Sequence, residues 1–424
     1  MSLPQPQTDL SGPHAGSRPG LSRAWLIVSL LWPVALLNYL DRQMLATMKT
    51  SMVTDIAGLT SEAQWGFVLG SFKWVYAGLS PIGGYIADRF SRKRIIVVSL
   101  FAWSVVTWLT GHVQNYEQLV WTRALMGISE AFYIPAALAL IADFHPGPTR
   151  SRAVGVHQTG IYVGVILGGY AGYVADAPAF GWRWAFSLAG LVGVVYALPL
   201  FFLLRDPPRS PDAVPQSLSP VRAVGALLTN RNYLLLVIYF TLPAIAGWVI
   251  RDWMPVILKN QFHLSQGRAG VIAVLYVQLA TIVGAVLGGW LADRWMRRQM
   301  RGRIYVSALG MLLFLPALFG LGNPGTVALA ATFLVLFGIG WGFFDGNNMP
   351  ILCQITRPEL RATGYGIMNL VSISCGGLGD WGFGALQDHG VPLTLIFGGF
   401  TGVALLSVIV VLLIRPEREG QPTA

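Results

Sequence analysis

Charge is scarce in this sequence. Only 11% of its 424 residues are Asp, Glu, Lys or Arg, whereas a soluble domain carries about 25%. Hydrophobic residues make up 54% of the chain, with 15 Trp and 49 Gly. This balance excludes an ordinary soluble domain. It is typical of a membrane protein, in which aromatic residues anchor at the interfaces and glycine allows close helix packing.

Cysteine and catalytic motifs are also nearly absent. Cys353 and Cys375 lie in apolar or near-apolar sequence without CxxC spacing, so we expect two buried packing residues and no disulfide framework. The sequence has no HExxH, GxSxG or P-loop pattern and no Cys/His metal spacing. We therefore expect no enzyme activity, no cofactor and no metal site.

Long apolar runs are abundant instead. Runs of about 20 residues are long enough to cross a bilayer, and their number predicts an all-α integral membrane protein with twelve transmembrane helices. The polar first 22 residues lack the pattern of a signal peptide, so we expect the first run itself to direct insertion. The approximate limits are 24–48, 64–87, 95–113, 118–142, 153–175, 183–204, 232–257, 269–292, 303–321, 326–352, 362–385 and 391–414.

The net charge of +10 follows the predicted topology. With both termini cytoplasmic, the inner segments hold most of the 29 Lys and Arg residues, which is the positive-inside bias. The basic charge therefore predicts orientation, a lipid bilayer as environment and no nucleic-acid partner. The main inner groups are Arg89 to Arg94, Arg150 and Arg152, Arg205 to Arg231, Arg294 to Arg303, and Arg415 and Arg418.

The two halves of the chain repeat each other. Residues 83–89, GGYIADR, return 205 positions later as GGWLADR at 288–294, and RAVG at 152–155 returns as RATG at 361–364. The duplication predicts two pseudo-symmetric six-helix bundles around a central path, an arrangement suited to alternating access. The predicted organisation is a disordered cytoplasmic tail 1–23, an N-terminal bundle 24–204, a cytoplasmic linker 205–231, a C-terminal bundle 232–415 and a cytoplasmic tail 416–424.

The repeated loop is itself a candidate for a part that changes conformation during transport. Its glycines allow close packing of the second span of each half, and its acidic and basic residues can form cytoplasmic salt bridges that open and close with the cycle. The basic cluster could instead serve topology alone. The candidate latch residues are Gly84, Asp88, Arg89, Arg92, Lys93, Gly289, Asp293 and Arg294.

These motifs resemble a known family. Asp88-Arg89-Phe90-Ser91-Arg92-Lys93 after Gly84 is similar to the signature loop of the major facilitator superfamily, and the resemblance covers about residues 24–415. Within that family, residues 38–42 (NYLDR) and 123–131 (RALMGISEA) resemble the anion:cation symporter branch, which includes sugar-acid and sialin-like carriers. The same segments, with the Leu140–Asp143 region, are also similar to the spinster-like branch.

Four charged residues lie inside the predicted spans of the N-terminal half. Asp41 and Arg42 are adjacent in the first span, and Arg123 and Glu130 are seven residues apart on one face of the fourth. We expect these four groups to cluster, because isolated charges in a bilayer are costly. A static salt-bridge set is one interpretation. Proton coupling is the other, with Asp41 and Glu130 as proton carriers, Arg42 as substrate ligand and Arg123 as the counter-charge; the resemblance implies the same roles.

The remaining candidates are polar residues in apolar surroundings. Lys73 lies in mid-span, and the sequence leaves open whether it contacts substrate or pairs with a carboxylate. Arg251-Asp252 mirrors Asp41-Arg42 in reversed order, and Asp345 is the C-terminal counterpart of Glu130. The additional substrate-site candidates are Asn38, Tyr39, His157, Gln158, Tyr162, Asn347, Asn348 and Asn369.

The predicted function is proton-coupled secondary transport of a small organic anion or sugar-type solute by a monomer in the bacterial inner membrane. The first alternative is a spinster-like carrier of lysolipids or other amphiphiles. An ion channel is the alternative of another class. Homologous halves with buried titratable groups favour a carrier, and no repeated selectivity loop indicates a channel.

Overall fold

The structure is a computed structural model that describes residues 21–145, 149–206 and 220–416. The predicted tail 1–23 therefore lies almost wholly outside the described residues, as do residues 207–219 of the linker. The helices are α1 Leu21–Thr47, α2 Lys49–Asp55, α3 Glu62–Arg89, α4 Arg92–Thr110, α5 Tyr116–Glu130, α6 Tyr133–Phe144, α7 Arg150–Asp176, α8 Gly181–Leu203, α9 Pro220–Thr229, α10 Arg231–Phe262, α11 Gln266–Met296, α12 Gly302–Leu321, α13 Val327–Ile355, α14 Arg361–Asp388 and α15 Leu393–Leu413, with a short 3₁₀ turn at Pro358–Leu360.

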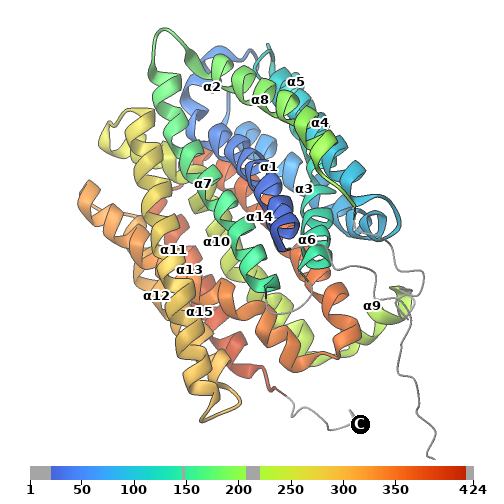
Figure 1. The fold of residues 1–424 in the computed structure, drawn as a ribbon. Helices are drawn as coiled ribbons and strands as arrows, with labels where there is room; N and C mark the ends of the chain where they lie inside the picture. Colours follow the sequence, from blue (N-terminus) through green and yellow to red (C-terminus); the bar gives the residue numbers. More distant parts are fainter. Residues whose placement is uncertain (1–20, 146–148, 207–219, 417–424) are drawn as a thin grey trace, which may run out of the picture.

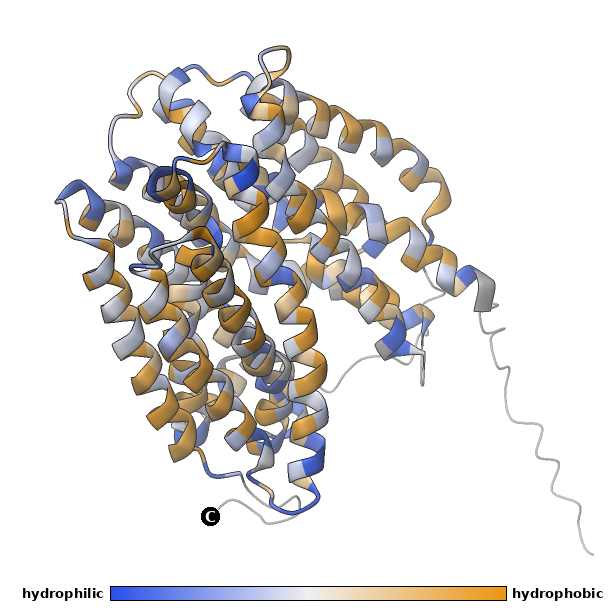
Figure 2. Cartoon of the chain, turned by 90° about the vertical axis from the view of Figure 1, so that its left-hand side faces the viewer, coloured by the Kyte–Doolittle hydropathy of each residue, from blue (hydrophilic) through white to orange (hydrophobic). Residues whose placement is uncertain are grey.

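The all-helical membrane fold is confirmed. In the described part of the chain, nine helical segments are long and apolar enough to cross a membrane, with α5 and α6 counted as one. Three further helices, α3, α7 and α14, have 27 or 28 residues each and bring the number of membrane-length helices to the expected twelve. They are less apolar because they pack in the contact between the two halves of the molecule. Hydrophobic residues cover most of the helix lengths (Figure 2).

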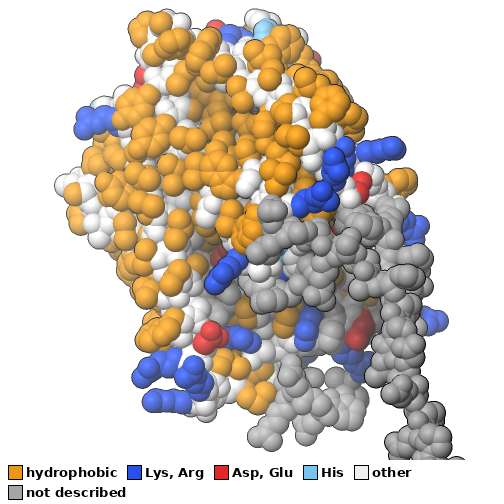
Figure 3. All heavy atoms as spheres, in the orientation of Figure 1, with side chains coloured by type: hydrophobic (Ala, Val, Ile, Leu, Met, Phe, Trp, Pro, Cys, Tyr) orange, Lys and Arg blue, Asp and Glu red, His pale blue; other side chains and the backbone are white. Residues whose placement is uncertain are grey.

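The helices form two groups that follow the duplication. Helices α1 and α3 to α8 form the N-terminal half, in blue to green, and α10 to α15 form the C-terminal half, in yellow to red (Figure 1). The predicted linker contains one helix that the sequence pattern did not reveal, α9, which lies beside the inner ends of α10 and α14. Lys and Arg side chains gather at the lower margin and right-hand side of the molecule, and the upper face is mostly hydrophobic (Figure 3).

Short polar side chains determine where several helices begin. Ser61, Asn115, Asn230, Ser265 and Thr326 each accept a hydrogen bond from the backbone amide three residues later. Such N-caps satisfy amides that have no partner within the helix. The fourth span is broken between α5 and α6, where Pro135 lies in the first turn of α6.

Helix ends from one half meet those from the other half at the outer side. Asp388, the last residue of α14, accepts hydrogen bonds from the amides of Glu62 and Ala63 at the start of α3, both at 2.8 Å. Asp176, the last residue of α7, accepts from the amide of Gly267 at the start of α11 at 3.0 Å. Each carboxylate therefore faces the positive end of a helix dipole.

Glycines let the outer halves approach closely. A Cβ at Gly66 would lie 2.3 Å from the carbonyl oxygen of Asp380, and one at Gly384 would lie 2.2 Å from that of Glu62. Both positions bring α3 and α14 into backbone contact. Gly169 similarly faces the carbonyl oxygen of Gly270, between α7 and α11. The outer side of the contact is therefore closed.

The inner part of this contact is more open. Gly78, Pro81, Ile82 and Tyr85 on the inner half of α3 are exposed, and a Cβ at Gly78 would meet no atom within 4 Å. The two halves are therefore in close contact along the outer part of α3 and not along its inner part.

Candidate functional site

The four charged residues predicted to cluster do so. Arg42 Nε donates to Glu130 Oε2 at 2.6 Å, and its Nη2 forms a second contact with the same oxygen. The hydroxyl of Thr107, on α4, donates to Asp41 Oδ2 at 2.9 Å. Arg123 lies within electrostatic range of both Asp41 and Glu130. Helices α1, α4 and α5 therefore assemble one buried ionic group within the N-terminal half.

Aromatic rings enclose the two guanidinium groups of this cluster. Arg42 lies 4.7 Å from the ring centre of Tyr39, 4.6 Å from that of Phe72 and 4.9 Å from that of Tyr76. Arg123 lies 4.9 Å from the same Phe72 ring. Cation–π contacts stabilise the cations where little water reaches them. The rings leave the in-plane N–H groups available to an anion.

The cluster is incompletely satisfied. Among the described residues, Asp41 Oδ1, Glu130 Oε1, and Nε and Nη1 of Arg123 have no hydrogen-bond partner, although all are buried. The side-chain amide of Asn38, fully buried beside Glu130, makes no hydrogen bond of ordinary length among the described residues either. Unpaired buried polar atoms are costly, so this site is built to accept further groups such as a proton, water or ligand.

A second ionic group joins the two halves. The ammonium of Lys73, on α3, contacts Asp252 on α10 and Asp380 on α14. Lys73 thus pairs with carboxylates, which was one of the two interpretations of its sequence; contact with a substrate stays a prediction. Asp252 is 7% exposed and lies inside the contact rather than at the outer surface. Asp380 was not among the candidates taken from the sequence. It is a charged residue within the apolar run 362–385, and Asp41 was identified because it is a charged residue within an apolar run, so the same criterion could have identified Asp380.

The candidates on α7 divide into two groups. His157 is buried, and its Nε2 lies 2.9 Å from the hydroxyl of Tyr133, which also hydrogen-bonds to the carbonyl oxygen of Leu31 at 3.2 Å. This geometry gives His157 a packing role between α7, α6 and α1. Gln158 and Tyr162 are partly exposed, and Tyr162 lies in electrostatic range of Asp345 across the molecule.

Asp345 lies between the halves. Its side chain is accessible on the surface of α13, yet it lies deep within the molecule, where Tyr162, Tyr239 and Tyr365 from three other helices are in electrostatic range of it. Asn369, half-buried on α14, hydrogen-bonds to the carbonyl oxygen of Tyr365 at 3.1 Å.

Asn347 and Asn348 are both buried. The side chain of Asn347 donates to the carbonyl oxygen of Phe343 in its own helix at 2.8 Å. That of Asn348 has no partner among the described residues. Of the two, Asn348 thus has free hydrogen-bonding capacity.

For the candidate latch residues, the structure corrects the prediction about their glycines. Close packing belongs to the first glycine of each pair, whereas Gly84 and Gly289 face open space. A Cβ at Gly83 would lie 2.6 Å from the carbonyl oxygen of Ala131, and one at Gly288 would lie 3.0 Å from Phe343. Neighbouring helix positions point about 100° apart, so only one glycine of a pair can face the adjacent helix.

The charged latch residues pair mostly near their own loops. Arg92 forms a salt bridge with Asp143 on α6 and donates to the carbonyl oxygen of Ala139 at 3.2 Å. Asp293 lies 4.0 Å from Arg303 in the C-terminal half. Three cations lie over aromatic rings: Arg89 over Tyr85, Lys93 over Phe201 and Arg294 over Trp290. The side chain of Asp88 lies outside the described part of the structure.

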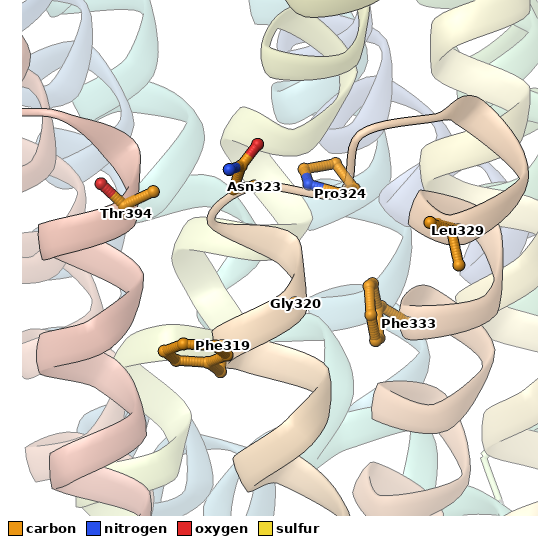
Figure 4. A pocket seen from close by; sticks show the side chains of 7 residues that line it. All are labelled: Phe319, Gly320, Asn323, Pro324, Leu329, Phe333 and Thr394. Atoms are coloured by element: carbon orange, nitrogen blue, oxygen red, sulfur yellow. The ribbon is translucent and has the colours of Figure 1, made fainter.

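A pocket on the outer surface is separate from these sites. It has a volume of about 350 Å³ and lies between α12, α13 and α15, next to Phe319, Phe333 and Thr394 (Figure 4). In the described residues, no group of three or more His, Cys, Asp or Glu is arranged to hold a metal ion.

The fold and the repeated loop are matched by a family profile. The Major Facilitator Superfamily profile covers residues 31–379 of the chain. The chain belongs to the major facilitator superfamily. It is therefore a multi-pass membrane transporter and not an enzyme, as the sequence predicted.

Relatives at sequence level include spinster proteins. The chain is 28% identical to protein spinster of Drosophila melanogaster over 84% of its own length and 60% of that protein. It is 28% identical to human spinster homolog 1, over 86% of this chain and 72% of the relative. For Danio rerio spinster homolog 3 the identity is also 28%, over 92% and 81% of the two chains. The chain thus spans about three-fifths of the length of the Drosophila relative.

Two solved structures share the fold. One is a bacterial homologue of the human lysosomal transporter spinster in an inward-facing, unoccupied conformation, with a TM-score of 0.75, 20% identity, and 93% and 95% coverage of the two chains. The other is a point mutant of the nucleoside transporter NupG, with a TM-score of 0.75, 13% identity, and 92% and 99% coverage. The comparisons favour the spinster-like branch over the anion:cation symporter branch, which reverses the order expected from the sequence.

Proposed function

We propose that this chain is a spinster-like, proton-coupled transporter that moves an amphiphile with an anionic headgroup, such as a lysolipid, by alternating access. The observation that carries the proposal is the incompletely satisfied cluster of Asp41, Arg42, Arg123 and Glu130. Asp41 and Glu130 supply proton acceptors, and Arg123 supplies unpaired donors for the headgroup.

Proton and substrate exchange follow from the pairing within this cluster. Arg42 forms a salt bridge with Glu130, whereas Asp41 has no salt bridge of its own: it accepts from the hydroxyl of Thr107 and is stabilised by the charges of Arg123 and Arg42 at longer range. An anion that binds Arg123 withdraws that charge from Asp41 and so favours proton binding there. Proton and anion would then bind together, as symport requires.

The choice of an amphiphile rests on the spinster relatives and on the aromatic rings of Tyr39, Phe72 and Tyr76 around the arginines. Such rings provide apolar contact area next to a cationic site. A small organic anion or sugar acid is the second candidate, because unpaired donors on Arg123 would equally bind a carboxylate. The proposed location is a bacterial inner membrane, with the protein acting as a monomer.

The test uses the full-length protein in liposomes with an imposed pH gradient. A fluorescent lysophospholipid and a radiolabelled sugar acid are offered in parallel. Accumulation of the lysophospholipid that collapses with a protonophore supports the proposal. Accumulation of the sugar acid alone supports the second candidate. Downhill movement of either probe that is unaffected by the pH gradient contradicts proton coupling.

A further inference from the structure

The contact between Lys73, Asp252 and Asp380 serves no step of the function proposed above. Lys73 is 3% exposed and Asp380 is fully buried. By residue counting, Lys73 lies roughly 16 Å below the outer end of α3 and Asp380 roughly 12 Å below that of α14. One ammonium from the N-terminal half thus links two helices of the C-terminal half at the level where the outer side is sealed.

This ionic contact must break when the outer side opens. Helix α3 packs along α14, with Gly66 and Gly70 against the backbone of Asp380 and Gly377. Separating these helices by one water layer withdraws Lys73 from both carboxylates. Asp252 and Asp380 then face each other without the ammonium that had held them together.

Two carboxylates that share one cation lie close to each other, and such a pair binds one proton readily once the cation leaves. Among the described residues, Asp380 Oδ1 makes no hydrogen bond of ordinary length, and its neighbour is the indole of Trp253. We propose that Asp252 and Asp380 form a second proton-binding site, in the C-terminal half, that takes up a proton from the outer side when Lys73 departs. This inference rests on the proposed proton coupling and adds a site to it.

The charged groups around the pair fit this exchange. On α10, Arg251 adjoins Asp252; it lies over the rings of Tyr39 and Trp248, each at 5.3 Å. Helix α5 brings Arg123 into electrostatic range of Asp252, and α1 brings Arg42 into range of Arg251. From α2, Lys49 lies 4.2 Å from the ring centre of Trp253. Arg251 therefore stays in the C-terminal half to balance the one carboxylate that remains ionised.

The sum of the formal charges connects proton uptake at Asp252 and Asp380 with anion binding at Arg123. In the sealed state, four acidic and four basic groups of the two ionic clusters balance. After opening and uptake of one proton, the C-terminal set is neutral and the N-terminal set carries one positive charge in excess. An anionic headgroup at Arg123 would cancel it. The groups are Asp41, Glu130, Asp252 and Asp380, against Arg42, Lys73, Arg123 and Arg251.

The experiment measures opening of the outer side directly, without substrate. Nitroxide labels at Gln114→Cys and Asn323→Cys, exposed outer positions in opposite halves, report the distance between halves by pulsed electron paramagnetic resonance in nanodiscs. Cys353→Ser and Cys375→Ala remove the native thiols. Because the open state would bind one proton more than the sealed state, the ratio of open to sealed molecules should rise as pH falls, by up to about tenfold per pH unit.

Asp252→Asn and Asp380→Asn should each flatten this pH dependence. Lys73→Gln, which leaves both carboxylates in place, should also flatten it, because without the ammonium the pair would hold a proton in the sealed state as well. Asp55→Asn is the matched control, because Asp55 pairs with Arg183 within the N-terminal half at 2.8 Å; it should leave the dependence unchanged. An unchanged slope in folded Asp252→Asn and Asp380→Asn overturns the second site. If these two variants do not fold, an undiminished slope in Lys73→Gln overturns it instead. Failure of Asp41→Asn to alter accumulation would count against the N-terminal cluster alone.

Discussion

Asp176 and Asp388 are structural equivalents in the two halves, and each one caps a helix of the opposite half. Asp176 ends α7 and accepts from the first turn of α11; Asp388 ends α14 and accepts from the first turn of α3. Their sequence offset of 212 residues is close to the 205-residue offset of the repeated GGxxADR loop. The two halves thus make two equivalent helix-capping contacts on the outer side of the molecule.

These caps should hold the outer side shut. Asp388→Asn keeps the shape of the side chain but removes the charge that faces the amino end of α3, and such interactions contribute about 1 kcal/mol. We expect outer opening to become about fivefold more frequent, since 1.4 kcal/mol is a factor of ten. The measurement is the rate at which an impermeant maleimide labels Gln43→Cys, a position buried between the halves, from outside.

Asp176→Asn should give a similar increase in labelling. Asp55→Asn serves as the control, because this outer carboxylate accepts from Trp182 and Arg183 of its own half. Equal labelling rates in all four proteins would show that the caps do not contribute to closure.

The paired glycines of the repeated loop should respond in opposite ways. Gly83→Ala places a Cβ 2.6 Å from the carbonyl oxygen of Ala131, and such overpacking costs about 1–3 kcal/mol. Gly84→Ala meets open space and should be neutral or stabilising by up to about 1 kcal/mol, because alanine is the better helix former. Thermal unfolding of the purified variants in detergent measures both.

The second copy offers an internal repeat of that comparison. Gly288→Ala should be destabilising and Gly289→Ala neutral. If Gly84→Ala or Gly289→Ala proves as harmful as its neighbour, the assignment of close packing to the first glycine is wrong.

The buried pair of Arg42 and Glu130 should behave as a unit. Removing one partner leaves the other charge uncompensated, at a cost of about 3–5 kcal/mol. We expect Arg42→Gln and Glu130→Gln each to lower the unfolding temperature clearly, and the double variant to lower it by less than the sum. Additive losses in this double-mutant cycle would show that the two side chains do not interact.

The N-terminal cluster was predictable because its signals are local. Arg123 and Glu130 share a helix face through their seven-residue spacing, and Asp41-Arg42 interrupts an apolar run. The partners of Lys73 were not predictable in this way. They lie 179 and 307 residues away on helices of the other half, and only the packing of α3 against α14 brings them together. The same limit explains why Gly83 could not be told from Gly84, since the sequence does not say which neighbour faces the helix.

The number and order of the long helices could be predicted from the length and hydropathy of the apolar runs. The positions of helix breaks and of short helices could not. The division of the fourth span at Ala131 and Phe132 arises from packing against Gly83 as well as from Pro135. Helix α9 is only ten residues long, and its sequence lies beside a proline-rich segment that favours a loop. Tertiary contacts decide such elements.

Proton-driven accumulation in liposomes tests the central claim most directly. Wild type, Asp41→Asn and Glu130→Gln are compared with an inward pH gradient and, separately, in counterflow without a gradient. We expect Asp41→Asn to lose accumulation while retaining counterflow, because a neutral amide still permits binding and exchange but carries no proton. Undiminished, pH-dependent accumulation by both Asp41→Asn and Glu130→Gln would contradict the account.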